Sequence, residues 1–253
     1  MKTILFLILI AFNIHSQSLS DFLFFMGDDA FNPTKVSSAT LSAWWEAGVN
    51  YRVSGGGAND TVYWTDKTTN ARVLTCALTI QNPSQITSGV NGHASLRFDG
   101  TNNKLGLTFT NNQPCTYYVV MKQITWTDGD YIWDGKIGTN AVAIIAQRGL
   151  TPELNMLSNT AWTNDNTDLA VNTWGVVYAY YNGASSKLRI NNNAATTGNP
   201  GSTNPEGFTI GSAGGGAFCS NIEVAEILIY AGTVSSADDV LIMKYLNSKY
   251  NIY

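Results

Sequence analysis

Two short segments of the chain combine acidic and amide side chains with large aromatic rings. The first runs from Trp126 to Asp134, and the second runs from Trp162 to Asp168. Flat aromatic faces can stack on sugar rings, while carboxylate and amide groups can hydrogen-bond sugar hydroxyls. These segments are therefore predicted to bind a ligand. The predicted ligand-binding residues are Trp126, Asp128, Asp130, Tyr131, Trp162 and Asn164.

The same segments have two alternative interpretations. Acids and amides are common in turns and tryptophan is mostly buried, so both segments could be purely structural. Either segment could also hold calcium, which takes roughly six to eight oxygen ligands, although the spacing does not match an EF-hand loop. Calcium is the one candidate cofactor, and its candidate ligands are Asp165 and Asp168.

The charge of the chain argues against nucleic acid as a partner. The 253 residues include 14 Lys and Arg and 18 Asp and Glu, which gives a net charge of −4. No basic stretch exceeds two residues, whereas neutralising phosphates requires clustered Lys and Arg. Only 13% of the residues are charged, so the surface is polar mainly through amides and hydroxyls.

Short apolar runs separated by turn residues predict an all-β domain, either a sandwich or a barrel. Glycine is abundant, with 23 residues, and turn residues recur at short intervals. An amphipathic segment near the C-terminus predicts one short helix, with Ser236 and Asp239 as its capping pair. Strands are expected at 41–46, 61–66, 94–99, 115–122, 131–133, 141–146, 173–181, 187–191, 208–211 and 223–230.

The three cysteines are far apart and form no C-x-x-C pair, so their spacing does not suggest a zinc site. In an exported protein one pair could be bridged, with one thiol left over. Alternatively, all three could be buried thiols in a β core. The sequence leaves both alternatives open for Cys76, Cys115 and Cys219.

The first 40 residues differ from the rest of the chain. Met1–Ser16 has one positive residue, a short apolar run and a small residue at its end, which is the pattern of a secretory signal peptide. A retained hydrophobic anchor is the alternative, although the run is shorter than the roughly twenty residues that span a bilayer. Residues 17–40 are predicted to form a connector arm, whose apolar patch Phe22–Met26 packs on its own domain or on a neighbouring subunit. A secreted or cell-surface location is expected, with a virion surface as the alternative.

Several motifs occur in an order and spacing that are familiar from one superfamily. They are Trp44-Trp45, Trp64-Thr-Asp-Lys67, Leu96-Arg-Phe-Asp-Gly100, Thr116–Val120, Trp174–Gly183, Phe208–Gly211, Val224–Tyr230 and Tyr245–Tyr250. From about Leu41 to Tyr253 the chain resembles the laminin-G-like branch of the concanavalin A-like lectin/glucanase superfamily. The resemblance implies a single jelly-roll β-sandwich of two antiparallel sheets over residues 41–253. Such domains occur in secreted bacterial proteins and phage structural proteins, mostly as carbohydrate-binding or adhesion modules.

The resemblance also implies where an active site would lie. Catalytic members hydrolyse glycans with acids in the arrangement Glu-x-Asp-x-(x)-Glu, whose alternate spacing puts the side chains on one face of a strand. The nearest match is Glu223-Val-Ala-Glu226, whose three-residue spacing predicts acids on opposite faces. His93 is the only histidine after the N-terminal segment, and no Gly-x-Ser-x-Gly elbow is present. The sequence therefore predicts no catalytic residues and no enzymatic activity.

These observations rank three functions. The first is a non-catalytic carbohydrate-binding or adhesion module on an exported or particle surface, with glycans or another cell-surface ligand as partner. The second is a phage virion structural protein, a spike or capsid-surface fibre, that is anchored through its N-terminus to a virion or membrane partner and could bind a host receptor. The third is a glycan hydrolase. An oligomer is compatible with all three, and no nucleic acid partner is expected.

Overall fold

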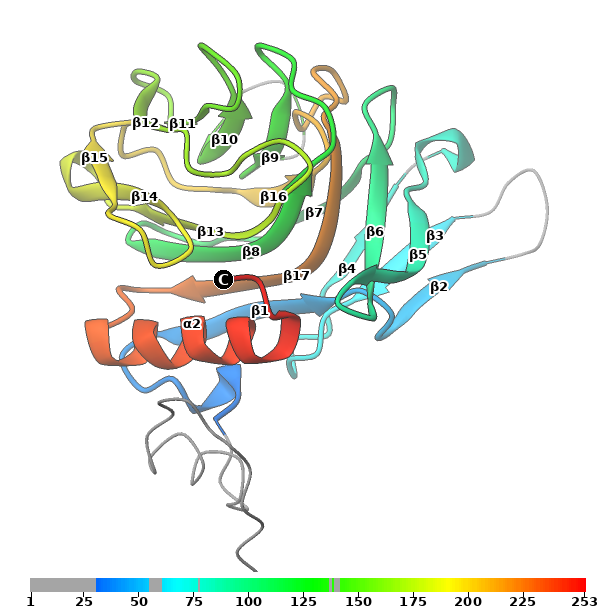
Figure 1. Cartoon of the computed structure of the whole chain (residues 1–253), viewed down its shortest axis with the longest axis horizontal. Coiled ribbons are helices and arrows are strands. Elements are labelled where there is room, and N and C mark those ends of the chain that lie inside the picture. Colours follow the sequence, from blue (N-terminus) through cyan, green and yellow to red (C-terminus); the bar gives the residue numbers. More distant parts are fainter. Residues whose placement is uncertain (1–30, 55–60, 77, 137, 139–141) are drawn as a thin grey trace, which may run out of the picture. The chain divides into compact units, whose positions relative to one another are not determined.

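Strands rich in β-branched and aromatic residues make up most of the chain, as its composition predicts. A computed structural model describes residues 31–54, 61–76, 78–136, 138 and 142–253 (Figure 1). Within Pro33–Tyr253, two antiparallel sheets pack face to face and one α-helix follows the last strand. The predicted all-β sandwich with one short C-terminal helix is confirmed. The predicted hydrophobic segment 1–16 and residues 17–30 of the connector lie outside the described residues.

Sheet A contains eight strands, in the order β15-β14-β13-β8-β17-β6-β5 with β1 also paired to β17. They are β1 (Thr40–Glu46), β5 (Ser84–Val90), β6 (His93–Asp99), β8 (Cys115–Gln123), β13 (Trp174–Tyr181), β14 (Ser186–Ile190), β15 (Thr196–Gly198) and β17 (Asn221–Ala231).

Sheet B contains nine strands, in the order β12-β11-β10-β9-β16-β7-β4-β3-β2. They are β2 (Tyr51–Val53), β3 (Val62–Thr65), β4 (Val73–Thr75), β7 (Leu105–Thr108), β9 (Tyr131–Asp134), β10 (Ile144–Gln147), β11 (Leu154–Leu157), β12 (Thr163–Asn166) and β16 (Gly207–Ile210). Among the described residues the helical elements are the 3-10 turns η1 (Pro33–Lys35), η2 (Thr79–Gln81) and η3 (Gly183–Ser185), and the α-helix α2 (Ser236–Tyr250).

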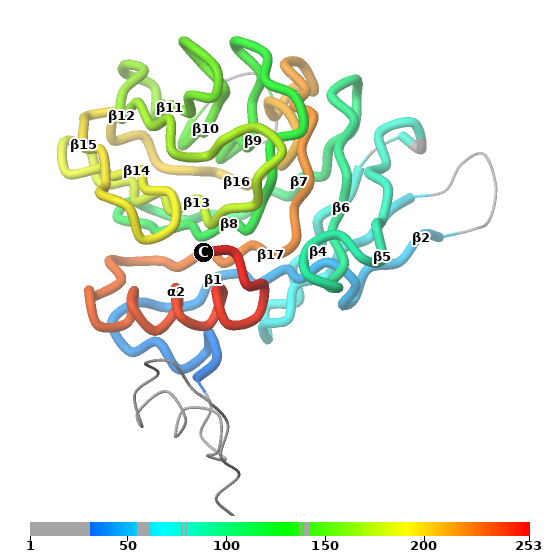
Figure 2. Tube along the Cα trace, viewed as in Figure 1, coloured from blue at the N-terminus to red at the C-terminus, as the bar shows by residue number. Residues whose placement is uncertain are grey.

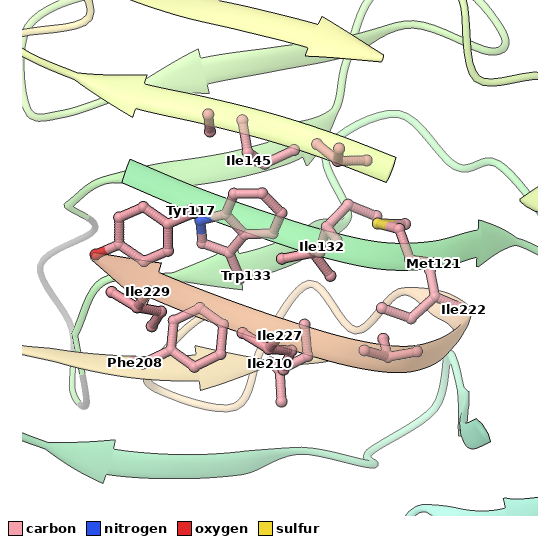
Figure 3. Close-up of a cluster of buried hydrophobic side chains, with 14 of the residues drawn as sticks. Tyr117, Met121, Ile132, Trp133, Ile145, Phe208, Ile210, Ile222, Ile227 and Ile229 are labelled. Carbon is pink, nitrogen blue, oxygen red and sulfur yellow. The ribbon is translucent and has the colours of Figure 1, made fainter. Parts of the chain in front are cut away.

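The core lies between the two sheets and is dominated by large rings. Tyr117 of β8 stacks on Trp133 of β9 and on Phe208 of β16, with ring centroids 6.0 and 6.1 Å apart. All three side chains are fully buried, and burying one such side chain stabilises a fold by about 1.5–3 kcal/mol. Figure 3 shows Phe208 beside Ile227 and Ile229 of β17, and Ile222 of the same strand beside Met121.

β17 occupies the centre of sheet A. Along one side it pairs with β8, and along the other side it pairs first with β6 and then with β1. Figure 2 shows the pairing of β17 with β1, two strands that are far apart in the sequence, with β17 in orange beside β1 in blue.

A β-bulge in β17 changes which residues face outward. The register against β8 shifts between Val224 and Glu226, and both Val224 and Ile227 belong to the core. The extra residue at the bulge therefore returns Glu226 to the outer face that Glu223 occupies. The prediction that these two acids lie on opposite faces is wrong, because a bulge interrupts the strict alternation of a strand.

The N-cap of α2 lies one residue before Ser236, the predicted capping residue. Ser235 is the N-cap, and its side chain accepts a hydrogen bond from the backbone N–H of Asp238 at 3.2 Å. Asp239 in the first turn accepts a hydrogen bond from the Tyr118 hydroxyl at 2.8 Å, so the helix packs on the outer face of sheet A. Among the described residues, no helix is long and apolar enough to cross a membrane.

The end of the predicted connector contacts the sandwich. The Tyr230 hydroxyl donates to the carbonyl oxygen of Pro33 at 3.0 Å, and the Ser38 hydroxyl donates to Asp238 at 2.5 Å. Residues 33–38 are therefore held against β17 and the start of α2.

All three cysteines are buried and free. Burial raises the pKa of the Cys115 thiol to about 12, so this side chain is a neutral, small apolar group in the core. Of the two alternatives for the cysteines, the structure favours the buried thiols over a bridged pair.

Candidate functional site

Three aromatic side chains from separate segments gather beside β9 and β12. Tyr131 begins β9, Trp162 precedes β12, and Phe218 lies in the loop before β17. The rings of Tyr131 and Phe218 are stacked, with centroids 5.4 Å apart and planes 18° apart. Trp162 meets Tyr131 edge to face at 6.0 Å. We call these three residues the aromatic platform.

The aromatic platform is solvent-accessible and carries a cation. The side chain of Phe218 is 58% exposed, and its backbone adopts a left-handed conformation with φ of 56°, which is strained for a bulky residue. Tyr131 donates its backbone N–H to the carbonyl oxygen of Phe218 at 2.8 Å, which fixes the loop beside β9. The guanidinium of Arg148 lies 4.8 Å over the ring of Trp162. An exposed, rigid group of rings with one cation is a surface on which a sugar can stack.

A buried glutamine positions the acidic loop beside the aromatic platform. Gln147 of β10 donates to the side chain of Gln123 at 2.7 Å and to the carbonyl oxygen of Thr125 at 2.8 Å. Its side-chain oxygen accepts the backbone N–H of Thr127 at 3.0 Å. Its backbone N–H donates to the carbonyl oxygen of Asp130 at 2.8 Å. These bonds hold the loop that carries the predicted acids in one conformation.

The carboxyl group of Asp130 is half-buried, which changes its acidity. Burial raises the pKa of the Asp130 carboxyl above its usual range, and a hydrogen bond with Thr127 only partly opposes this effect. The carboxyl also lies near Cys219, whose thiol pKa is raised by burial and then by Asp130. A carboxylic acid that keeps its proton at higher pH can act as a general acid.

Asp134, at the other end of β9, has a structural role. Its two oxygens accept the backbone N–H groups of Val142 at 3.1 Å and Gly214 at 2.9 Å, which ties two loops together. Burial raises the pKa of Asp134 to about 6, and the hydrogen bonds and the charge of Lys136 oppose the rise without cancelling it.

This raised pKa makes stability depend on pH. The folded state holds the proton of Asp134 more tightly than the unfolded chain, so ionising Asp134 costs folding free energy. We expect the unfolding free energy of the native protein, relative to that of Asp134→Asn, to fall by up to roughly 2–3 kcal/mol as the pH rises from about 4 to about 6. Urea unfolding of both proteins across this range measures the difference. A constant difference would contradict the burial argument.

The structure distributes the predicted site residues over three places. Asp130, Tyr131 and Trp162 lie at the aromatic platform. Trp126 and Asp128 lie on the neighbouring loop, where the indole N–H of Trp126 donates to the carbonyl oxygen of Glu153 at 2.9 Å and Asp128 accepts the N–H of Gly149 at 3.0 Å.

Asn164, Asp165 and Asp168 lie elsewhere. Asn164 is buried, and its amide donates to the carbonyl oxygens of Ser186 at 3.1 Å and Thr196 at 3.2 Å, so it joins β12 of sheet B to β14 and β15 of sheet A. Asp165 and Asp168 are exposed. Within the described part of the chain, no three His, Cys, Asp or Glu side chains form a cluster suited to a metal ion.

Two residues of this surface are absent from the sequence-based prediction. Arg148 follows β10, and Phe218 lies 87 positions after Tyr131, so only the folded sheet brings them together. The sequence does carry one signal for Phe218, because it is a large apolar residue that follows a glycine-rich turn instead of lying in a strand.

Two further acids, Glu226 and Glu46, lie on the outer face of sheet A, but their carboxylates are already hydrogen-bonded or ion-paired within the protein. Glu226 is fully buried, and its carboxylate accepts hydrogen bonds from four side chains at 2.6–2.9 Å. Glu46, its cross-strand neighbour, pairs with Lys67 at 2.6 Å and with Lys249 at 2.8 Å. Glu226 cannot reach a substrate, so this acid group stabilises the fold. The four donors to Glu226 are Trp44, Tyr245, Lys249 and Tyr250.

The chain is similar in fold to solved structures of known proteins. No model of a known protein family and no curated protein matches the chain. Among solved structures, a Trypanosoma rangeli sialidase in complex with sialic acid matches with a TM-score of 0.54 and 12% identity, over 82% of this chain and 33% of the sialidase. A GH54 α-L-arabinofuranosidase soaked with a cyclic sulfate inhibitor matches with a TM-score of 0.55 and 12% identity, over 85% of this chain and 60% of that chain. The chain thus spans less than two thirds of the length of these enzymes.

These matches correct the functional prediction. The sequence-based ranking places a non-catalytic binding module first, a virion structural protein second and a hydrolase last, and it expects no enzyme. The two solved structures named above, whose fold is similar to that of this chain, are a sialidase and an arabinofuranosidase. A missing Glu-x-Asp-x-Glu pattern is therefore not a reason to exclude catalysis, because the acids of a β-sandwich can come from its loops.

Proposed function

We propose that this chain is a glycan-hydrolysing domain whose substrate stacks on the aromatic platform. The observation that carries this proposal is the aromatic platform of Tyr131, Trp162 and the exposed Phe218, with Asp130, whose pKa burial raises, directly before Tyr131 in the chain. The similarity in fold to glycoside hydrolases supports the same direction. The partner is accordingly a glycan.

The proposed chemistry uses two carboxyl groups of one loop. As the general acid, Asp130 donates a proton to the glycosidic oxygen as the bond from that oxygen to the anomeric carbon breaks. Asp128, which is exposed, takes a proton from the water molecule that forms the new bond to the anomeric carbon. Arg148 and Trp162 orient the sugar. The loop that carries Asp128 and Asp130 is held in one conformation by hydrogen bonds between Gln147 and the backbone of Thr125 and Thr127.

We also propose the finer family assignment and the layout of the chain. Residues 41–253 would be a laminin-G-like domain, because the order of the motifs from Trp44 to Tyr250 agrees with that branch. Met1–Ser16 would direct export or serve as an anchor, and residues 17–40 would connect it to the sandwich, which implies a secreted or cell-surface protein. The mass of the protein from its native source tests the layout, since a cleaved signal peptide removes Met1–Ser16.

Replacing Trp162 tests the aromatic platform. We expect Trp162→Ala to raise the KM for a hydrolysed oligosaccharide by about five- to thirtyfold, because stacking on an indole contributes about 1–2 kcal/mol of binding. Release of reducing ends from a panel of plant and bacterial polysaccharides identifies a substrate and measures the change. Trp174→Ala is the matched control, because Trp174 is a half-buried tryptophan under a cation, Lys122, on sheet A.

Two results would reject the proposal. Absence of turnover for the whole panel at high enzyme concentration would remove the hydrolase assignment. Equal loss of activity in Trp162→Ala and Trp174→Ala would place the active surface away from the aromatic platform.

A further inference from the structure

A cavity of about 490 Å³ lies at the edge of sheet B, where β2 begins and β3 ends. It is separate from the aromatic platform, because β4, β7 and β16 lie between β3 and β9 in the sheet. The volume is in the range of cavities that bind small molecules, roughly 300–1,000 Å³. The residues that line it include Asn50, Arg52, Thr65, Asp66, Lys67 and Thr68.

Two of the three charged residues in this cavity are already paired. Asp66 is buried, and its oxygens accept the backbone N–H groups of Thr68 at 2.6 Å and Arg72 at 2.7 Å. The ammonium group of Lys67 pairs with Glu46 at 2.6 Å and lies 3.6 Å over the ring of Trp44. Neither charge is directed at a ligand.

Arg52 is different. Its side chain is exposed, and in the part of the chain that the structure describes no carboxylate lies within ion-pair distance of it. The guanidinium lies 4.2 Å over the ring of Tyr63, the cross-strand partner of Arg52. Stacking fixes the plane of the group and leaves its N–H donors at the edge, where they can bind a carboxylate in a bidentate manner.

The rest of the wall offers neutral hydrogen-bonding groups. Thr65 and Thr68 carry hydroxyls, and Asn50 carries an amide that can donate and accept. Asn50 and Ala71 both have left-handed backbones, with φ of 53° and 47°, which shape the turns around the cavity. A non-glycine residue such as alanine adopts this conformation at a cost, and such strain concentrates at binding sites.

We infer that this cavity is a binding site for a hexuronic acid, either free or as one residue of an acidic polysaccharide. The carboxylate of the sugar pairs with Arg52, and the ring hydroxyls bond to Thr65, Thr68 and Asn50. This site is independent of the proposed hydrolysis, since it shares no residue with the aromatic platform.

Titration with D-glucuronate and with D-glucose tests the inference, because the two sugars differ by the carboxylate. Chemical-shift changes in ¹⁵N-labelled protein report both affinity and location. We expect glucuronate to shift the amide signals of residues 50–52 and 65–68, and glucose to leave them in place. Arg52→Gln should weaken glucuronate binding at least tenfold, because a charge-assisted bond is lost. Lys187→Gln removes an exposed cation from β14 and should leave binding unchanged.

Three results would overturn the inference. Glucuronate could fail to bind, it could bind equally well to Arg52→Gln, or sulfate and phosphate could displace it at the same concentration, which would mean that the cavity recognises any anion. Measuring the hydrolytic activity of Arg52→Gln together with its affinity for glucuronate distinguishes a failure of this inference from a failure of the proposed function. Normal turnover together with lost glucuronate binding supports the second site, whereas loss of both would mean that the cavity is not an independent site.

Discussion

Glu226→Ala should lower the free energy of unfolding by about 3–5 kcal/mol, the cost of removing one partner from a buried ion pair. In the native protein the Glu226 carboxylate is fully buried and accepts a hydrogen bond from Lys249 at 2.7 Å. It also accepts the Trp44 indole N–H at 2.6 Å and the hydroxyls of Tyr245 and Tyr250 at 2.9 and 2.7 Å. Alanine would leave all four donors without this buried acceptor, and only Lys249 would keep another carboxylate partner, Glu46 at 2.8 Å. Urea unfolding followed by tryptophan fluorescence measures the effect.

Glu206→Ala is the matched control for this substitution. Glu206 also pairs with a lysine, Lys136, at 2.6 Å, but its side chain is 62% exposed. Its removal should cost at most about 1 kcal/mol, since water screens an exposed pair. The double variant Glu226→Leu with Lys249→Met should be more stable than Glu226→Ala, because it fills the space of the carboxylate and removes the ammonium group that loses this acceptor, while Glu46 keeps its ion pair with Lys67. A loss below about 1 kcal/mol in Glu226→Ala would show that α2 does not depend on this carboxylate.

Asp130→Asn should lower kcat by at least a hundredfold on any glycan that the protein hydrolyses, because a general acid typically contributes about 10²–10⁴ in rate. The amide keeps the size of the side chain but has no acidic proton to donate. The native enzyme should lose activity as the pH rises through the pKa of Asp130, which burial holds above that of an ordinary aspartate. In Asp130→Asn this basic limb of the kcat/KM profile should disappear from the residual activity.

Binding separates a catalytic from a structural effect of this substitution. Asp130→Asn should retain the native KM, because stacking on Trp162 and Phe218 is unchanged. Glu206→Gln, which alters an exposed carboxyl beside β16, should retain both kcat and KM. If Asp130→Asn keeps more than a tenth of the native kcat, another group donates the proton.

The strands are largely predictable from sequence because each buried strand carries its own run of β-branched and aromatic residues. The segment 115–122 is an example, since β8 extends over Cys115–Gln123. The bulge in β17 is not predictable in this way. Nothing in Glu223-Val-Ala-Glu226 marks an irregularity, which arises from pairing with β8 and depends on residues a hundred positions earlier in the chain.

The candidate site shows the same limit. Tyr131 and Trp162 can be selected from sequence because each lies among acids and amides in a loop. Arg148 lies near them only because β10 is next to β9 in sheet B. Phe218 lies near them only because the loop before β17 is hydrogen-bonded to Tyr131 at the start of β9. Asn164 lies in an equally polar segment, yet its amide joins the two sheets, because the edge strand β12 lies beside β14 and β15. Composition alone does not distinguish these two roles.

The central place of β17 has a consequence for how the chain is made. A ribosome releases the strands in sequence order, so β1, β6 and β8 all emerge before the strand that pairs with each of them. Until residues 221–231 leave the exit tunnel, sheet A exists only as separate pieces with unsatisfied edges, which are prone to pair with other chains. Nascent chains of this protein should therefore depend on chaperones until synthesis is nearly finished, and fragments that stop before β17 should aggregate instead of forming a smaller sandwich.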